Sequence, residues 1–92
     1  VVEALGAGVS GLSLGERVVV NPGVSCGRCE ACLDGADNLC ERYLLIGESR
    51  WGGEAELVVV PAANVVAAPP ELSDETLAAL PVTYLTAWHM LA

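Results

Sequence analysis

The chain has 92 residues, enough for one small domain, and its formal net charge is −8, from 4 Lys plus Arg against 12 Asp plus Glu. This acidic balance excludes binding to nucleic acid or to anionic membranes through clustered cations. An acidic disordered tail is excluded as well, because 53% of the residues are hydrophobic and the mean hydropathy is +0.52. The sequence has no basic leader, no long uninterrupted apolar span and no N-glycosylation sequon, so we expect a cytoplasmic protein.

Residues 1–20 predict two short β-strands joined by a glycine-rich turn. Val1–Leu5 and Glu16–Val20 are rich in β-branched residues, and the motif Gly6-x-Gly8-x-x-Gly11 lies between them. That spacing matches the dinucleotide-binding fingerprint, but the fingerprint requires a helix that opens at its third glycine. A second β-branched run follows instead. We therefore interpret the glycines as the turn of a β-meander rather than as a nucleotide site.

The segment 21–42 holds all four cysteines and few bulky apolar side chains, so we expect a loop-like lobe without a core of its own. The cysteines are Cys26, Cys29, Cys32 and Cys40, in the spacing C-x2-C-x2-C-x7-C. Four closely spaced thiolates favour one Zn²⁺ ion. Because all four ligands are Cys, the metal has no open position for water, which predicts a structural rather than a catalytic site. Gly23, Gly27 and Gly35 allow the chain reversals that bring the thiols to one centre.

Three alternatives to zinc stay open for these cysteines. An iron–sulfur cluster is the nearest, since C-x2-C-x2-C resembles a ferredoxin run, although Cys40 follows after seven residues and precedes Glu41 rather than Pro. Two disulfides would imply export, and four free thiols would leave a reactive cluster exposed. For a zinc site of formal charge −2, we expect Arg28 and Arg42 to offset the charge and backbone N–H groups to donate to sulfur.

Residues 43–70 predict short strands separated by turns. Tyr43–Ile46 is a short apolar piece, and strands are expected at Ala55–Val60 and Asn64–Ala68, each ended by proline. Glu54 and Glu56 flank Ala55 on one face of the expected strand, which indicates a solvated face rather than a catalytic pair.

Residues 71–92 predict two helices. Ser73 is an N-cap candidate for a helix over Asp74–Leu80, and Pro81 is suited to open a second helix over Val82–Ala92. His89, the only histidine, is interpreted as a packed or surface residue because no second histidine or cysteine lies near it. Along the second helix, an apolar stripe recurs at three- and four-residue spacing: Val82, Leu85, Trp88, His89 and Ala92. Since the chain opens inside a β-branched run and its last helix has no C-cap, we expect a piece of a longer protein.

Several motifs together resemble the medium-chain zinc-containing alcohol dehydrogenase/quinone oxidoreductase superfamily. They are, in order, Gly15-Glu16-Arg17-Val18-Val19-Val20-Asn21-Pro22, the four-cysteine spacing, Asp37-Asn38-Leu39-Cys40, Gly53-Glu54-Ala55-Glu56 and Pro81-x-x-x-x-Thr86-Ala87-Trp88. The resemblance implies a mainly β fold with C-terminal helices. Its parts are a partial GroES-like β-barrel over residues 1–70, a four-cysteine zinc lobe at about residues 22–42, and the helical start of the interdomain connection over residues 71–92. The family's Rossmann domain, which carries NAD(P), is absent from these residues.

The same resemblance implies that no catalytic residue lies in this chain. The first two catalytic-zinc ligands of the family would lie upstream, and the third would fall near Val82, which cannot bind metal. Thr86 matches the family's threonine that contacts the nicotinamide end of the cofactor. Leu57 stands where the family has an aromatic residue, which is a mild departure.

We therefore expect a fragment of an NAD(P)-dependent oxidoreductase that transfers hydride to or from a small alcohol, aldehyde, quinone or enone. On its own the fragment would bind one structural zinc and be inert. Its partner would be the missing Rossmann domain or a second copy of the chain. The alternative is a stand-alone, zinc-ribbon-like module that docks a protein partner.

Overall fold

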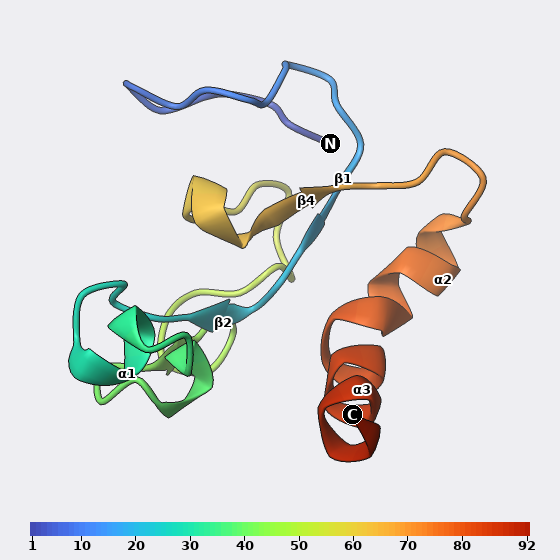
Figure 1. Cartoon of the computed structure of the whole chain (residues 1–92). Coiled ribbons are helices and arrows are strands. Elements are labelled where there is room, and N and C mark those ends of the chain that lie inside the picture. The colour runs from blue at the N-terminus through green and yellow to red at the C-terminus, as the bar shows by residue number, and fades with distance from the viewer. The chain divides into compact units, whose positions relative to one another are not determined.

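The computed structural model describes residues 1–92 as two compact units (Figure 1). The first unit combines residues 1–21 with residues 65–92, and the second unit is residues 22–64. Each unit contains one two-stranded antiparallel sheet, so only part of the expected barrel forms and the barrel is not closed. No helix is long and apolar enough to span a membrane.

The sheet of the first unit pairs β1 (Val18–Val20) with β4 (Val65–Ala67). Val19 lies opposite Val66, and the pairing is extended by a hydrogen bond of 3.0 Å from Ala68 N to Arg17 O. Consecutive β-branched residues favour this extended pairing. The expected strands at Glu16–Val20 and Asn64–Ala68 therefore form, with shorter bounds.

The strand expected at Val1–Leu5 does not form. Only Val2 pairs, with Gly15 N donating to its carbonyl oxygen at 2.7 Å and its own N–H donating to Glu16 O at 2.9 Å. Between these partners the chain turns at Gly8 (φ 80°) and Gly11 (φ 82°), in a backbone region that favours glycine. No helix opens after Gly11, so the glycines form turns and not the entry to a dinucleotide fold.

The C-terminal part of the first unit is helical. Ser73 is the N-cap of α2 (Asp74–Ala79), as expected, and its hydroxyl oxygen accepts a hydrogen bond of 3.2 Å from Thr76 N. The predicted break before a second helix at Val82 is wrong. The chain instead continues through a π-helical turn, Leu80–Tyr84, into α3 (Leu85–Leu91). Pro81 has no N–H to donate, and the wider turn accommodates its ring without ending the helix.

An ion pair and one buried leucine hold α2 against β1 within the first unit. Arg17 Nε donates to Asp74 Oδ1 at 2.9 Å, and the Arg17 guanidinium also reaches Pro69 O at 3.5 Å. Leu77 of α2 is only 5% exposed and lines one hollow together with the β1 valines. The core is thin, since Leu77 is the only buried hydrophobic residue of this unit.

The second unit contains the cysteine lobe and the small sheet at the base of that lobe. Its sheet pairs β2 (Gly23–Val24) with β3 (Leu44–Leu45), and Ile46 N continues the pairing to Pro22 O at 3.0 Å. Its helical turns are α1 (Glu30–Leu33), η1 (Asp37–Leu39) and η2 (Ala62–Asn64). The sheet joins the two ends of the cysteine lobe, residues 22–42, and so closes that lobe at its base.

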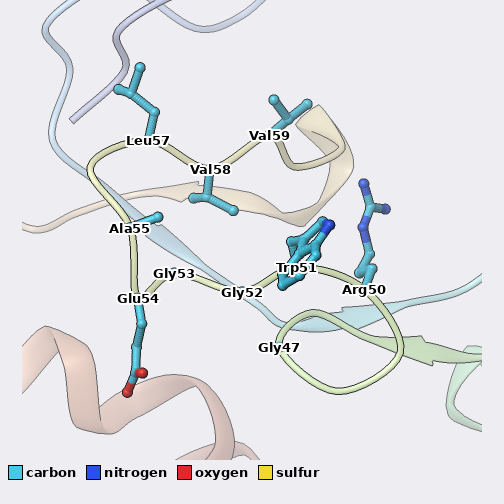
Figure 2. A pocket seen from close by; sticks show the side chains of 10 residues that line it. All are labelled: Gly47, Arg50, Trp51, Gly52, Gly53, Glu54, Ala55, Leu57, Val58 and Val59. Atoms are coloured by element: carbon cyan, nitrogen blue, oxygen red, sulfur yellow. The ribbon is translucent and has the colours of Figure 1, made fainter.

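The strand expected at Ala55–Val60 is absent, although the chain there is extended. Figure 2 shows the side chains of Leu57 and Val59 on one side of the backbone and that of Val58 on the other. No segment of this chain pairs with it, and Leu57 and Val59 are 69% and 84% exposed. The sequence supplies β-propensity, but a strand also requires a hydrogen-bonded neighbour.

Candidate metal centre

The sulfur atoms of the four cysteines lie close together in the cysteine lobe. Cys26 follows β2, Cys29 is the N-cap of α1, Cys32 lies within α1, and Cys40 follows η1. All four Sγ atoms lie within 4.8 Å of one another. The Cys29 and Cys32 sulfurs are 3.5 Å apart, and the Cys26 and Cys32 sulfurs 4.0 Å apart.

Local backbone geometry produces this convergence. Gly27 (φ 74°) and Gly35 (φ 82°) adopt left-handed conformations that turn the chain on either side of α1. Within α1, the hydrogen bond from Leu33 N to Cys29 O, 3.0 Å long, fixes Cys29 and Cys32 on one turn. The predicted reversals at these two glycines are thus present.

Gly23 has a different role from the predicted one. Its φ is not positive, and it lies in β2 beneath the Tyr43 side chain. A Cβ atom at this position would stand 2.8 Å from the Tyr43 Cζ atom, which is too close. Glycine at this position therefore leaves room for the Tyr43 ring, and its role is not in a turn.

The sulfurs of Cys26 and Cys40 each accept two hydrogen bonds from backbone N–H groups. Cys26 Sγ accepts from Cys29 N at 3.3 Å and from Arg28 N at 3.5 Å. Cys40 Sγ accepts from Cys26 N and from Arg42 N, both at 3.3 Å. The two arginines thus contribute main-chain donors to the cluster. Such N–H···S bonds favour the thiolate form, which is the form that binds metal.

The pKa values of Cys26, Cys29 and Cys32 shift in different directions. The N–H groups of Arg28 and Cys29 lower the pKa of Cys26 to about 6, and the N–H group of Cys32 lowers the pKa of Cys29. Burial raises the pKa of Cys32 to about 11. Desolvation and the neighbouring sulfurs oppose a negative charge on Cys32, and a bound cation would offset this.

The donor set fits zinc. Metal–sulfur bonds of about 2.3 Å in a tetrahedron place the sulfurs about 3.8 Å apart, which agrees with the 3.5 and 4.0 Å separations of the two sulfur pairs. Cys40 is 6% exposed, while the other three cysteines are half-buried. The cluster can therefore enclose one cation with little opening for a fifth ligand.

Other residues singled out from the sequence lie outside this cluster. Val82 lies in the π-helical turn, and Thr86 and His89 lie on α3 with exposed side chains. Glu54 and Glu56 are both exposed and form no ion pair. None of these residues adds a ligand to the cysteine cluster.

A hollow of about 850 Å³ lies elsewhere in the second unit. It is lined by Gly47, Arg50, Trp51, Gly52, Gly53, Glu54, Ala55, Leu57, Val58 and Val59 (Figure 2). The Trp51 ring is 93% exposed, and Figure 2 shows the Glu54 carboxylate pointing away from the valines. The hollow lacks a converging set of polar groups and offers no chemistry of its own.

Sequence reasoning missed Asn64, a buried polar residue at the root of the lobe. Its Nδ2 donates to Gly23 O at 2.5 Å, and its exposed fraction is 8%. The Asn64–Gly23 bond ties the η2 turn to the strand that leads into Cys26. Nothing in the local sequence indicates it, because the two residues lie 41 positions apart.

Comparison with protein families matches residues 1–70 to the alcohol dehydrogenase GroES-like domain. Among curated proteins, the chain is 41% identical over 75 residues to the starvation-sensing protein RspB of Escherichia coli (strain K12). It is 37% identical over 75 residues to L-threonine 3-dehydrogenase of Marinomonas sp. (strain MWYL1). Each match covers 82% of this chain and 22% of the relative, so the chain spans less than a quarter of the length of these proteins.

Solved structures agree with these matches. An NAD-dependent alcohol dehydrogenase superposes with a TM-score of 0.92 at 57% identity, over 96% of this chain and 26% of that one. A thermostable alcohol dehydrogenase from Pyrobaculum aerophilum, solved with cobalt and zinc bound, gives a TM-score of 0.86 at 44% identity, over 97% of this chain and 27% of that one.

Proposed function

The chain belongs to the alcohol dehydrogenase GroES-like domain family of zinc-type medium-chain dehydrogenases, and we propose that it forms the structural-zinc portion of an NAD(P)-dependent oxidoreductase. The observation that carries the proposal is the meeting of four cysteine sulfurs within 4.8 Å of one another. In this proposal Cys26, Cys29, Cys32 and Cys40 hold one Zn²⁺ ion. The ion would supply cross-linking of the lobe and no Lewis-acid chemistry, because every ligand position is a thiolate.

The cysteine lobe needs such a cross-link. Of the side chains between Cys26 and Cys40, only Cys40 is buried, and Leu33 and Leu39 are 74% and 71% exposed. Apolar burial therefore contributes little to the order of these residues. A structural zinc ion supplies about 10–16 kcal/mol in small sites at neutral pH, which is the scale that ordering such a loop requires.

In the whole protein, we infer hydride transfer between NAD(P) and a small alcohol or carbonyl compound. The relatives support this class, since those compared include an NAD-dependent alcohol dehydrogenase and an L-threonine 3-dehydrogenase. Thr86 is the residue of this chain that would meet the cofactor. Val82 offers no donor atom for a catalytic metal, so any such ion would depend on residues elsewhere in the protein.

By itself the chain should be catalytically inert. The glycine motif Gly6-x-Gly8-x-x-Gly11 is not followed by a helix, whose N-terminus would hold the pyrophosphate. Fluorescence titration with NADH tests this point. Micromolar binding that weakens in Gly8→Ala would contradict the proposal, because it would make the glycine turn a nucleotide site.

The partner of this portion should be the Rossmann domain of the whole protein or, without that domain, a second copy of the chain. This chain leaves one apolar face of α3 uncovered, since Leu85, Trp88 and Leu91 are 54%, 74% and 90% exposed. Sedimentation at low micromolar concentration should show self-association of the isolated chain. A monomer at all concentrations would contradict this part of the proposal.

Metal analysis tests the zinc assignment directly. Protein purified under reducing conditions should contain one zinc per chain and no iron. Visible charge-transfer bands with bound iron, or a metal-free protein with two disulfides, would refute it. The family match extends over residues 1–70 and not only over the cysteines, which favours the enzyme portion over a stand-alone zinc-ribbon-like module.

A further inference from the structure

We propose that Cys29 and Cys32 form the redox-sensitive pair of the zinc lobe, which a hydroperoxide converts to a disulfide with release of the metal. This inference rests on the proposed zinc site and adds its regulation. It assigns the oxidation to one pair among four sulfurs that have the same role as zinc ligands.

The first argument is distance within one turn. The sulfurs of Cys29 and Cys32 are 3.5 Å apart, closer than the 4.0 Å between Cys26 and Cys32. A disulfide bond is about 2.05 Å long, so the two atoms must approach by about 1.5 Å. Both residues lie on the turn closed by the hydrogen bond from Leu33 N to Cys29 O. Rotation of the two side chains can therefore supply the approach without rearrangement of the loops.

The second argument is the distribution of hydrogen bonds. Two N–H···S bonds of 3.3–3.5 Å end on Cys26 Sγ, and two more end on Cys40 Sγ. These bonds hold both sulfurs in position, and neither sulfur can move to form a disulfide without losing them. Cys29 Sγ and Cys32 Sγ instead lie in short contact with each other. Cys40 is also the least accessible thiol, at 6% exposure.

The chemistry balances with a hydroperoxide as the oxidant. One thiolate of the pair attacks a peroxide oxygen, the O–O bond breaks, and a sulfenic acid and one water are formed after protonation. The second thiolate attacks the sulfenic sulfur, the S–O bond breaks, and hydroxide leaves as the second water. Two sulfurs are oxidised by two electrons in total, and hydrogen peroxide is reduced to two waters. Zinc keeps its charge throughout and loses two of its four ligands.

The consequence is a reversible loss of order in the lobe. With only Cys26 and Cys40 left as thiolates, a four-coordinate site cannot be maintained, and residues 26–40 lose their cross-link. A disulfide across two intervening residues is reduced readily by cellular thiols, so thiol reductant and zinc together would restore the site.

The test adds one equivalent of hydrogen peroxide to the zinc-loaded chain and follows released zinc with a chromophoric indicator. Remaining thiols are then blocked with N-ethylmaleimide, and the protein is cut after arginine. Cleavage after Arg28 separates Cys26 from a 29–42 peptide, and a further cut before Asp34 separates Cys40 from the pair. We expect one zinc released per disulfide, with the disulfide inside residues 29–33 and with both Cys26 and Cys40 blocked.

Two variants that replace one cysteine by histidine, and so keep a four-ligand zinc set, form a matched pair. Cys32→His removes the proposed pair and should release zinc at least about fivefold more slowly, whereas Cys26→His retains it and should release zinc at the wild-type rate. If a variant does not load zinc, the disulfide map of the wild-type chain still decides.

A disulfide that includes Cys26 or Cys40, or zinc release without a disulfide, would overturn the pairing and leave the zinc site intact. Absence of zinc before peroxide is added would overturn the proposed function and this inference together. Thiol reductant with added zinc should restore one zinc per chain, and failure to do so would refute the reversible switch.

Discussion

Removal of zinc with a chelator should unfold the cysteine lobe and leave the β1–β4 pair in place. Hydrogen bonds to the cysteine sulfurs order the lobe, since the N–H groups of Cys29 and Arg42 donate to Cys26 Sγ and Cys40 Sγ. The β1–β4 pair is held instead by its own ladder, in which Val19 lies opposite Val66 and no sulfur takes part. Chelation therefore removes the main support of one region and no support of the other.

The magnitude follows from how little else orders the lobe. Zinc binding contributes about 10 kcal/mol or more in small structural sites, and ordering the backbone costs about 1–2 kcal/mol per residue. If only about a third of that binding energy remains as local stability, amide exchange is slowed roughly 200-fold. Chelation should abolish this protection at Leu33 and Arg42, whose N–H groups are hydrogen-bonded in the lobe.

Amide exchange with and without chelator, read residue by residue, measures the effect. Ala68, whose N–H donates to Arg17 O, should exchange at a rate within about threefold of that of the zinc-loaded protein. Addition of excess zinc should restore protection in the lobe and serves as the control. Uniform loss of protection at Leu33 and Ala68 alike would refute the reasoning, because it would show that both regions unfold as one cooperative unit.

Three further predictions concern backbone conformation, packing and capping. Gly27→Ala, at φ 74°, should weaken zinc binding about five- to thirtyfold in a competition titration with a chromophoric chelator. The reason is that a residue other than glycine costs about 1–2 kcal/mol in the left-handed conformation. The control is Gly53→Ala, which has open space around the added Cβ and should bind zinc as the wild type does. Leu77→Ala, at a 5% exposed site, should destabilise the first unit by about 2–4 kcal/mol in denaturant unfolding, whereas Leu91→Ala, 90% exposed, should cost under about 0.5 kcal/mol; equal effects would contradict the burial argument. Ser73→Ala should lower the stability of α2 by about 1 kcal/mol, visible as faster exchange at Thr76 N, and unchanged exchange there would show that the cap contributes nothing.

Local sequence signals determined the parts of this protein whose causes are local. The N-cap at Ser73 was predictable because an N-cap bonds to an N–H three residues ahead, here that of Thr76. The turns at Gly27 and Gly35 were predictable because glycine alone adopts positive φ without strain. The candidate ligands could be named because four thiols at this spacing have few stable uses other than metal binding.

Tertiary structure decided the features that depend on a partner distant in sequence. Ala55–Val60 has the composition of a strand, but no other segment of this chain pairs with it. Pro81 was expected to divide two helices, but the helix continues past it through a π-helical turn. In the same helical segment, Leu77 packs beside β1. The Asn64–Gly23 bond and the contact of Tyr43 with Gly23 at the root of the lobe carry no sequence signal at all, because side-chain contacts across a chain are set by its path in space and not by neighbours in sequence.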